Sequence, residues 1–183
     1  MTQRARQGEI VVTQAMVVRA FLIVIALGVV VIVAFGDRPV KVDGPAPALA
    51  GTTLNGETFA LEALRGQVVF LNFMGSWCGP CVRELPDLQA ASKAFPDVRF
   101  VAVAVDSPEP DLRALMTKTG VDWPVVPAKD AALAPWRLRS VPMSAIVDRS
   151  GALRWSRAGA VTRAEAEDAL RAVGAGGAAA PTP

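Results

Sequence analysis

The cysteines of this chain occur as one close pair, within the pentapeptide Trp77-Cys78-Gly79-Pro80-Cys81. The chain has 2 cysteines in all, and two thiols at this spacing can close a small disulfide ring. A purely structural staple is a poor explanation, because closing so short a loop removes little entropy from the unfolded chain. A zinc site is also a poor explanation, because zinc needs about four ligands and the sequence has no further cysteine and no histidine. The pair is therefore predicted to exchange its disulfide with another protein.

The sequence around the pair predicts a buried strand followed directly by a helix. Residues 67–74 (QVVFLNFM) form a short apolar run that is typical of a buried strand. Leucines at helical spacing then predict a helix from the cysteine pair to about residue 95, with Pro86 as a kink. At the N-terminus of this helix, unpaired N–H groups and the positive end of the dipole should lower the pKa of the Cys78 thiol. Cys78 is thus the predicted attacking residue, and Cys81, one turn later and more buried, is predicted to resolve the mixed disulfide.

The residues beside the cysteines suit such a turn from strand to helix. Gly79 lets the backbone turn, and Pro80 suits an early helical position, where its missing N–H group is not needed. Trp77 is predicted to cover one side of the reactive sulfur, and an ordinary core aromatic is the alternative.

Strands and helices alternate along the remaining sequence, which predicts an α/β fold with a mixed central sheet. The dipeptide Asn55-Gly56 between short β-capable stretches predicts a hairpin over residues 52–60. Near the C-terminus, Thr162 and Glu165 form a capping box that opens the last helix. Further strands are expected at residues 98–105, 123–126, 143–148 and 152–156, and helices at 111–119, 131–138 and 162–173.

Residues 20–35 form an unbroken run of apolar residues and glycine. Together with residues 16–18, the run is long enough to cross a hydrocarbon core of about 30 Å as a helix, provided that Arg19 snorkels toward the headgroups. The arginines before the run predict that the N-terminus lies inside and everything after residue 36 outside. The alternative is a cleaved signal peptide, with a weak cleavage site at Ala34-Phe35-Gly36. In both cases the rest of the chain meets an oxidising compartment, in which disulfides persist.

The charge distribution argues against a nucleic-acid partner. Lys and Arg number 19 and Asp and Glu number 17, which gives a formal net charge of +2. The excess lies at the N-terminus, because the part after residue 36 has equal numbers of basic and acidic residues. A basic surface for nucleic acid therefore has no support in the composition.

The sequence around the cysteine pair resembles a known family. The pentapeptide after an apolar strand resembles the thioredoxin fold, and three segments together resemble the membrane-anchored TlpA-like thiol:disulfide oxidoreductases, a group that includes the periplasmic reductases of cytochrome c maturation. The segments are NGETFALEALRGQVVFLNFMGSWCGPCVRELP, FPDVRFVAVAVD and SVPMSAIVDRSG. The resemblance implies a thioredoxin-like α/β fold with a central mixed β-sheet flanked by helices, an N-terminal β-hairpin extension and an N-terminal transmembrane helix.

The composition of its successive segments, together with this resemblance, predicts that the chain divides into five parts. These are a cytoplasmic segment (residues 1–15), a transmembrane anchor (16–36), a tether with several prolines (37–48), a thioredoxin-like domain (49–173) and a flexible tail (174–183). The anchor implies a single-pass protein of the inner (cytoplasmic) membrane, with the lipid bilayer as a partner and the catalytic domain in the periplasm or another extracytoplasmic space.

The resemblance also implies roles for residues outside the pentapeptide. Glu84 matches an acidic residue that follows the second cysteine by three positions, from which it could relay a proton to or from Cys81; a solvated helix carboxylate is the alternative. Pro142 matches a cis-proline loop that faces the sulfur atoms, and the Val141 backbone would pair with an extended substrate segment. Together with Trp77, these two residues would form the substrate-binding surface. Asn72 stands where thioredoxins proper carry a buried aspartate.

The function implied by the resemblance is a protein disulfide reductase that uses no cofactor and no metal. The Gly-Pro pair between the cysteines resembles the reducing members of the family. Electrons would come from a membrane-embedded thiol-electron donor. They would pass to a disulfide-bearing extracytoplasmic protein, and the haem-binding segment of an apocytochrome c is the favoured candidate.

Two other functions use the same residues. A copper-site assembly factor or Cu(I) chaperone would bind the metal through the two thiolates, since soft thiolates suit Cu(I). A peroxiredoxin-like peroxidase would want a proline and a threonine or serine seven and three positions before the reactive cysteine, where this chain has Leu71 and Gly75.

Overall fold

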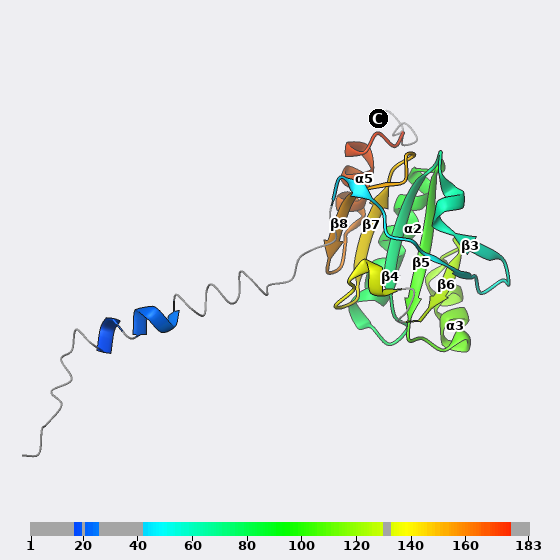
Figure 1. Cartoon of the computed structure of the whole chain (residues 1–183). Coiled ribbons are helices and arrows are strands. Elements are labelled where there is room, and N and C mark those ends of the chain that lie inside the picture. The colour runs from blue at the N-terminus through cyan, green and yellow to red at the C-terminus, as the bar shows by residue number, and fades with distance from the viewer. Residues whose placement is uncertain (1–16, 20, 26–41, 130–132, 177–183) are drawn as a thin grey trace, which may run out of the picture. The chain divides into compact units, whose positions relative to one another are not determined.

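The computed structural model describes residues 17–19, 21–25, 42–129 and 133–176 (Figure 1). The chain divides into two compact units, Met1–Arg38 and Pro39–Pro183, and every strand and helix labelled in Figure 1 belongs to the second unit. Of the predicted membrane span, residues 16, 20 and 26–36 lie outside the described residues, and the others are helical. In the described part of the chain, no helix has the length and apolar character needed to cross a membrane.

A mixed sheet forms the centre of the second unit, and its strands follow the order β1-β8-β7-β4-β5-β6 (Figure 1). β4 and β6 both run parallel to β5, whereas β7 runs antiparallel to β4 and to β8, and β1 runs antiparallel to β8. The strands span Gly44–Pro45 (β1), Val68–Met74 (β4), Val98–Val105 (β5), Val125–Ala128 (β6), Met143–Val147 (β7) and Ala152–Ala158 (β8). The predicted α/β fold with a mixed central sheet is confirmed.

Every residue of β4 is buried, because both faces of the sheet are covered. On one face, Phe70 of β4 stacks on Phe100 of β5, with ring centroids 4.8 Å apart, beneath a cluster to which the helices contribute. On the opposite face, Phe73 packs against Trp136 at 5.0 Å. The alternation of side chains along a strand therefore sends apolar residues into two layers, which explains the continuous apolar run. The helices of the first face are α2 (Gly79–Ala94), α3 (Glu109–Thr119) and α5 (Arg163–Ala172).

The predicted hairpin is present and covers the second face of the sheet. β2 (Ala50–Thr52) pairs antiparallel with β3 (Thr58–Ala60), and Gly56 takes a positive φ of 84° in the turn, a conformation that glycine adopts without strain. Leu49 and Phe59 are buried in the cluster that contains Trp136. The 3-10 helix η1 (Leu61–Leu64) leads from the hairpin toward β4.

The predicted tether, residues 37–48, is wrong in its second half. Gly44–Pro45 forms the edge strand β1 on β8, and the amide of Ala46 donates a hydrogen bond to the carbonyl of Gly151 at 3.0 Å. A proline is tolerated there because an edge strand leaves some N–H groups unpaired. So short a strand has no periodic pattern to be recognised in the sequence. Residues 37–41 lie outside the described residues.

Two short elements differ from the sequence prediction. β6 begins at Val125 rather than at residue 123; the Trp123 side chain before it is buried, and its indole N–H donates to Gln89 on α2. Of the helix predicted over residues 131–138, residue 133 is α-helical, and the 3-10 helix η2 (Ala134–Trp136) follows it directly and has Arg137 as its C-cap. Residues 130–132 lie outside the described part.

The C-terminal helix α5 begins with the predicted capping box of Thr162 and Glu165. It ends with Gly174 at a positive φ of 75°, and the amides of Gly174 and Ala175 donate to the carbonyls of Arg171 and Leu170. This is the hydrogen-bond pattern of a Schellman motif. Ala175 is buried, so packing continues past residue 174, where the sequence predicts that the tail begins. Residues 177–183 lie outside the described residues.

Candidate active site

Cys78 and Cys81 form a disulfide directly after β4, with their Cα atoms 5.3 Å apart. Cys78 is the N-cap of α2, and Gly79 and Pro80 are the first residues of that helix, as the sequence predicts. The amide of Cys81 donates to the Cys78 Sγ atom at 3.2 Å. Because the first turn of α2 has no acidic residue, nothing there offsets the positive end of the helix dipole. A thiolate at Cys78 would be stabilised by both features, which lowers the pKa of a thiol.

The two sulfur atoms differ in accessibility and in surroundings. Cys78 is 5 % exposed and Cys81 is 0 % exposed, so an incoming partner can reach only Cys78. The Cys78 Sγ atom lies 3.7 Å from the carbonyl oxygen of Val141. This arrangement agrees with the predicted order, in which Cys78 attacks and Cys81 resolves.

The predicted cis-proline loop faces the disulfide. The peptide bond between Val141 and Pro142 is cis, and the Pro142 carbonyl accepts a hydrogen bond from the amide of Gly159 at 2.9 Å. The loop before β7 is therefore held in place by the segment that follows β8. Pairing of the Val141 backbone with a substrate segment stays a prediction.

Glu84 lies one turn after Cys81 on α2 and is buried, with 4 % of its surface exposed. Its Oε1 atom accepts a hydrogen bond from Nδ2 of Asn72 at 2.8 Å, and its Oε2 atom accepts one from the amide of Val161 at 2.8 Å. The alternative of a solvated helix carboxylate is therefore wrong. The carboxyl group instead joins α2 to β4 and to the segment that precedes α5.

Burial raises the pKa of Glu84 above its ordinary value of 4.5, and the hydrogen bonds from Asn72 and Val161 oppose that rise only in part. A carboxyl group with a raised pKa is better suited to take up and release a proton near neutral pH. Burial also raises the pKa of a thiol, so Cys81 in the reduced protein needs a base before it can attack. Glu84 is a buried carboxyl within one helical turn of Cys81 and can serve as that base.

Trp77 is 63 % exposed, so its alternative assignment as a core aromatic is wrong. Its ring lies against Gly75, where a Cβ atom would come within 2.7 Å of the ring. The indole N–H donates to the carbonyl of Asp106 at 3.2 Å, and the amide of Ser76 donates to Oγ of Ser107 at 2.9 Å. The turn between β5 and α3 thus fixes an exposed aromatic ring beside the disulfide. Binding of substrate by this ring stays a prediction.

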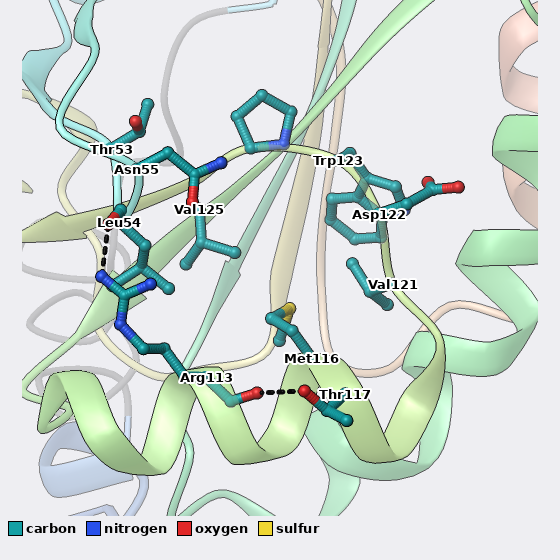
Figure 2. Close-up of a pocket in the computed structure, with 11 residues that line it drawn as sticks. Thr53, Leu54, Asn55, Arg113, Met116, Thr117, Val121, Asp122, Trp123 and Val125 are labelled. Carbon is teal, nitrogen blue, oxygen red and sulfur yellow. Dashed lines mark hydrogen bonds between the residues drawn. The ribbon is translucent and has the colours of Figure 1, made fainter.

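An open groove lies between the hairpin tip, α3 and the start of β6 (Figure 2). Figure 2 shows Arg113 reaching from α3 to the carbonyl of Leu54, while the Thr117 hydroxyl donates to the Arg113 carbonyl. The lining contains neither cysteine nor any other predicted site residue, so this groove is separate from the redox pair. The lining residues are Thr53, Leu54, Asn55, Arg113, Met116, Thr117, Val121, Asp122, Trp123, Pro124 and Val125.

Three residues at the site have no role that the sequence predicts. Asn72 and Ser144 occupy facing positions of β4 and β7, and both are fully buried. Their polar character within otherwise apolar strands is the signal by which a sequence could indicate them. Val161 acts through its backbone amide, for which a sequence has no signal.

Comparisons with known proteins agree with this geometry. The sequence model of the AhpC/TSA family matches residues 42–156, which include the cysteine pair. The thiol-disulfide oxidoreductase ResA of Geobacillus kaustophilus is 29% identical over 137 residues, which cover 73% of this chain and 79% of the relative. The thioredoxin-like protein YneN of Bacillus subtilis is 30% identical over 130 residues, which cover 68% of this chain and 76% of the relative.

Solved structures show the same fold. A thiol:disulfide interchange protein of the thioredoxin family from Chlorobium tepidum matches with a TM-score of 0.66 and 26% identity, covering 75% of this chain and 97% of that one. The structure of MTB dsbF in mixed oxidized and reduced forms matches with a TM-score of 0.64 and 26% identity, covering 68% of this chain and 94% of that one.

Proposed function

The chain belongs to the AhpC/TSA family of thioredoxin-fold proteins, and we propose that it is a membrane-anchored, extracytoplasmic reductase of protein disulfides. Its chemistry is that of a thiol:disulfide oxidoreductase of the TlpA-like group. The observation that carries the proposal is the Cys78–Cys81 disulfide at the N-terminus of α2, with its accessible sulfur beside the Val141 carbonyl.

The reaction consists of two exchanges. In the reduced protein, the Cys78 thiolate attacks one sulfur of the substrate disulfide, a mixed disulfide forms, and the other substrate sulfur leaves as a thiolate. Cys81 then gives its proton to Glu84 and attacks the Cys78 sulfur. The Cys78–Cys81 disulfide forms, and the second substrate sulfur leaves as a thiolate. Two electrons have passed to the substrate, and a dithiol donor must return two electrons to the pair.

The proposal also covers the direction of the reaction, the electron donor and the electron acceptor. The Gly79-Pro80 pair favours the reducing direction, because it resembles the reducing members of the family. A reductase outside the cytoplasm needs a source of electrons, and a membrane-embedded thiol carrier would supply them. The favoured acceptor is the haem-binding segment of an apocytochrome c, since haem attachment requires free thiols.

The apolar run of residues 20–35 supports the membrane anchor in this proposal. An anchor confines the redox pair to the membrane surface and raises its effective concentration near membrane-bound partners. Extraction of the full chain by detergent but not by carbonate or high salt would support the anchor. Release of an N-terminally shortened chain into the soluble fraction would support the cleaved signal peptide instead.

Trapping of partners tests the proposed function directly. The Cys81→Ser variant, expressed in its native membrane, should accumulate mixed disulfides with its partners, because the resolving thiol is absent. The matched Cys78→Ser variant should accumulate none. Adducts with Cys78→Ser alone would reverse the two roles, and the absence of adducts with either variant would reject the exchange mechanism. Identification of the trapped proteins names the substrate and the electron donor.

The two alternative functions have weaker support. The described residues contain no group of three or more His, Cys, Asp and Glu side chains that could hold a metal, so a Cu(I) role would need a methionine or a second molecule beside the two thiolates. Tight Cu(I) binding with negligible insulin reduction would favour the copper function. For a peroxidase, Leu71 stands where a proline would be wanted, and Gly75, which lies under the ring of Trp77, has no hydroxyl group.

A further inference from the structure

A small polar cluster lies inside the apolar core next to the redox pair. Asn72 of β4, Glu84 of α2 and Ser144 of β7 are 0 %, 4 % and 0 % exposed. Cys81, one turn before Glu84 on the same helix, is fully buried as well. Burying polar groups is costly unless their hydrogen bonds are made, so the pattern of donors and acceptors constrains which protonation states fit the cluster.

The side-chain amide of Asn72 directs its donors at its neighbours. Its Nδ2 atom donates to Oε1 of Glu84 at 2.8 Å and to Oγ of Ser144 at 3.3 Å. Its Oδ1 atom is buried and has no hydrogen-bond partner among the described residues. A neutral carboxyl group could have donated a hydrogen bond to that oxygen had the amide been turned. In the observed orientation the amide leaves its own oxygen without a hydrogen bond and directs an N–H donor at Glu84. This arrangement suits an ionised carboxylate.

The second oxygen of Glu84 is also used as an acceptor. Its Oε2 atom accepts a hydrogen bond from the Val161 amide at 2.8 Å, and a backbone N–H can only donate. A neutral carboxyl group would carry a hydroxyl on one of its two oxygens, and a hydroxyl oxygen accepts a hydrogen bond more weakly than a carboxylate oxygen does. Both contacts therefore favour the ionised form, against the effect of burial.

No charged side chain supplies this stabilisation. Burial and the hydrogen bonds from Asn72 and Val161 account for the shift in the pKa of Glu84, and no cation contributes. The facing side chains of β4 and β7, Asn72 and Ser144, do not titrate. The ionisable residues of α2 and its N-cap, besides Glu84, are Cys78, Cys81, Arg83, Asp87 and Lys93. Those of α5 are Arg163, Glu165, Glu167, Asp168 and Arg171, and the acids of α5 form ion pairs with arginines.

We propose that Asn72 is a positioning residue that holds Glu84 in its ionised, proton-accepting form beside Cys81. The proposal rests on the proposed function, in which Glu84 takes the proton of Cys81 as that thiol attacks the mixed disulfide. Val161 cannot replace Asn72 in this role, because its amide serves the other carboxylate oxygen. Without Asn72, the Oε1 atom would have no hydrogen bond to offset the effect of burial. The pKa of Glu84 would then rise further, and the group would hold its proton more tightly.

The first test measures the proton affinity of Glu84 and needs no activity. In the full chain in detergent, with the disulfide intact, the carboxyl carbon of Glu84 is followed by NMR as a function of pH. In Asn72→Leu, a replacement of similar shape without hydrogen bonds, the midpoint should rise by about one unit or more, which corresponds to a tenfold gain in proton affinity. An unchanged or lowered midpoint would overturn the proposal. If the variant does not fold, the wild type provides the test. Its Asn72 side-chain amide resonances should shift with pH at the same midpoint as the Glu84 carboxyl carbon, and resonances that do not change with pH would refute the contact.

The second test follows resolution of a mixed disulfide. Reduced protein is mixed with a small aromatic disulfide, and the rate of release of its second thiol is measured across pH. Asn72→Leu should slow this step about tenfold below the Glu84 midpoint and leave it unchanged well above it, whereas a merely structural defect would slow it at every pH. In a Glu84→Gln background, Asn72→Leu should have no further effect. An equal slowing in both backgrounds would refute the proposal. A wild type that releases no thiol at any pH would instead refute the proposed function.

Discussion

Replacing Glu84 with glutamine should change how the stability of the oxidised protein depends on pH. Burial raises the pKa of Glu84 in the folded state above 4.5. The contribution of this carboxyl group to the free energy of unfolding is therefore fully present below its unfolded pKa and is lost as the pH rises through the folded value. The loss amounts to about 1.4 kcal/mol for each unit by which the folded pKa exceeds the unfolded one.

Glutamine does not titrate, so the variant should escape this loss. The variant also has one side-chain oxygen where the structure uses two as acceptors for Asn72 and Val161. One of these two N–H donors then loses its acceptor, which lowers the free energy of unfolding of the variant by about 1–3 kcal/mol at every pH. The difference in stability, wild type minus variant, should therefore fall as the pH rises from about 4 through the folded pKa, and become constant above it.

Urea denaturation of both proteins between pH 4 and pH 8, with the disulfide intact, measures this difference. Glu167→Gln is a matched control with the opposite sign, because hydrogen bonding from Arg163 holds the pKa of Glu167 below its usual range. In that pair the difference should be fully present above the unfolded pKa and should fall as the pH drops from there toward the folded pKa. A Glu84 difference that is independent of pH, or that grows with rising pH, would refute the reasoning.

Two further substitutions test contacts around the site. Gly75→Ala should displace the ring of Trp77, because the new Cβ atom would lie 2.7 Å from it, and the indole N–H resonance of Trp77 should shift. Gly176→Ala is the matched control: a Cβ atom there would have no other atom within 4 Å, so the Trp77 resonance should stay in place. Thr162→Ala removes the capping box of α5 and should lower the free energy of unfolding by about 1 kcal/mol in urea denaturation, and an unchanged midpoint would show that the box adds nothing.

Elements with a strong local pattern could be predicted from the sequence. The β5 strand occupies the predicted residues, Val98–Val105, because a short segment with four valines and a phenylalanine favours a buried strand. The hairpin at Asn55-Gly56 and the capping box at Thr162 were found for the same reason, since turn and cap residues act on their own neighbours. β1 could not be found, because its two residues are ordered by pairing with a strand more than a hundred residues later.

The candidate site divides in the same way. The disulfide, the start of α2 and the position of Glu84 follow from spacing within one helical turn. The partners of Glu84 do not, because Asn72 lies 12 residues before it and Val161 lies 77 residues after it. Only the fold places a strand, a helix and a loop around one carboxyl group. The sequence could offer only the hint that Asn72 is a polar residue in an apolar strand.

The spacing of the two cysteines does more than permit a ring. Cys78 caps α2 and meets N–H donors and the positive end of the dipole, so its thiolate is stabilised without any base. Three residues later, Cys81 points into the core, where burial raises the pKa of a thiol. The same helical turn therefore makes one sulfur a ready nucleophile and the other dependent on a proton acceptor. Glu84 lies one further turn along the same helix, and the hydrogen bonds from Asn72 and Val161 counter the burial that would otherwise keep its carboxyl group protonated and unable to accept that proton.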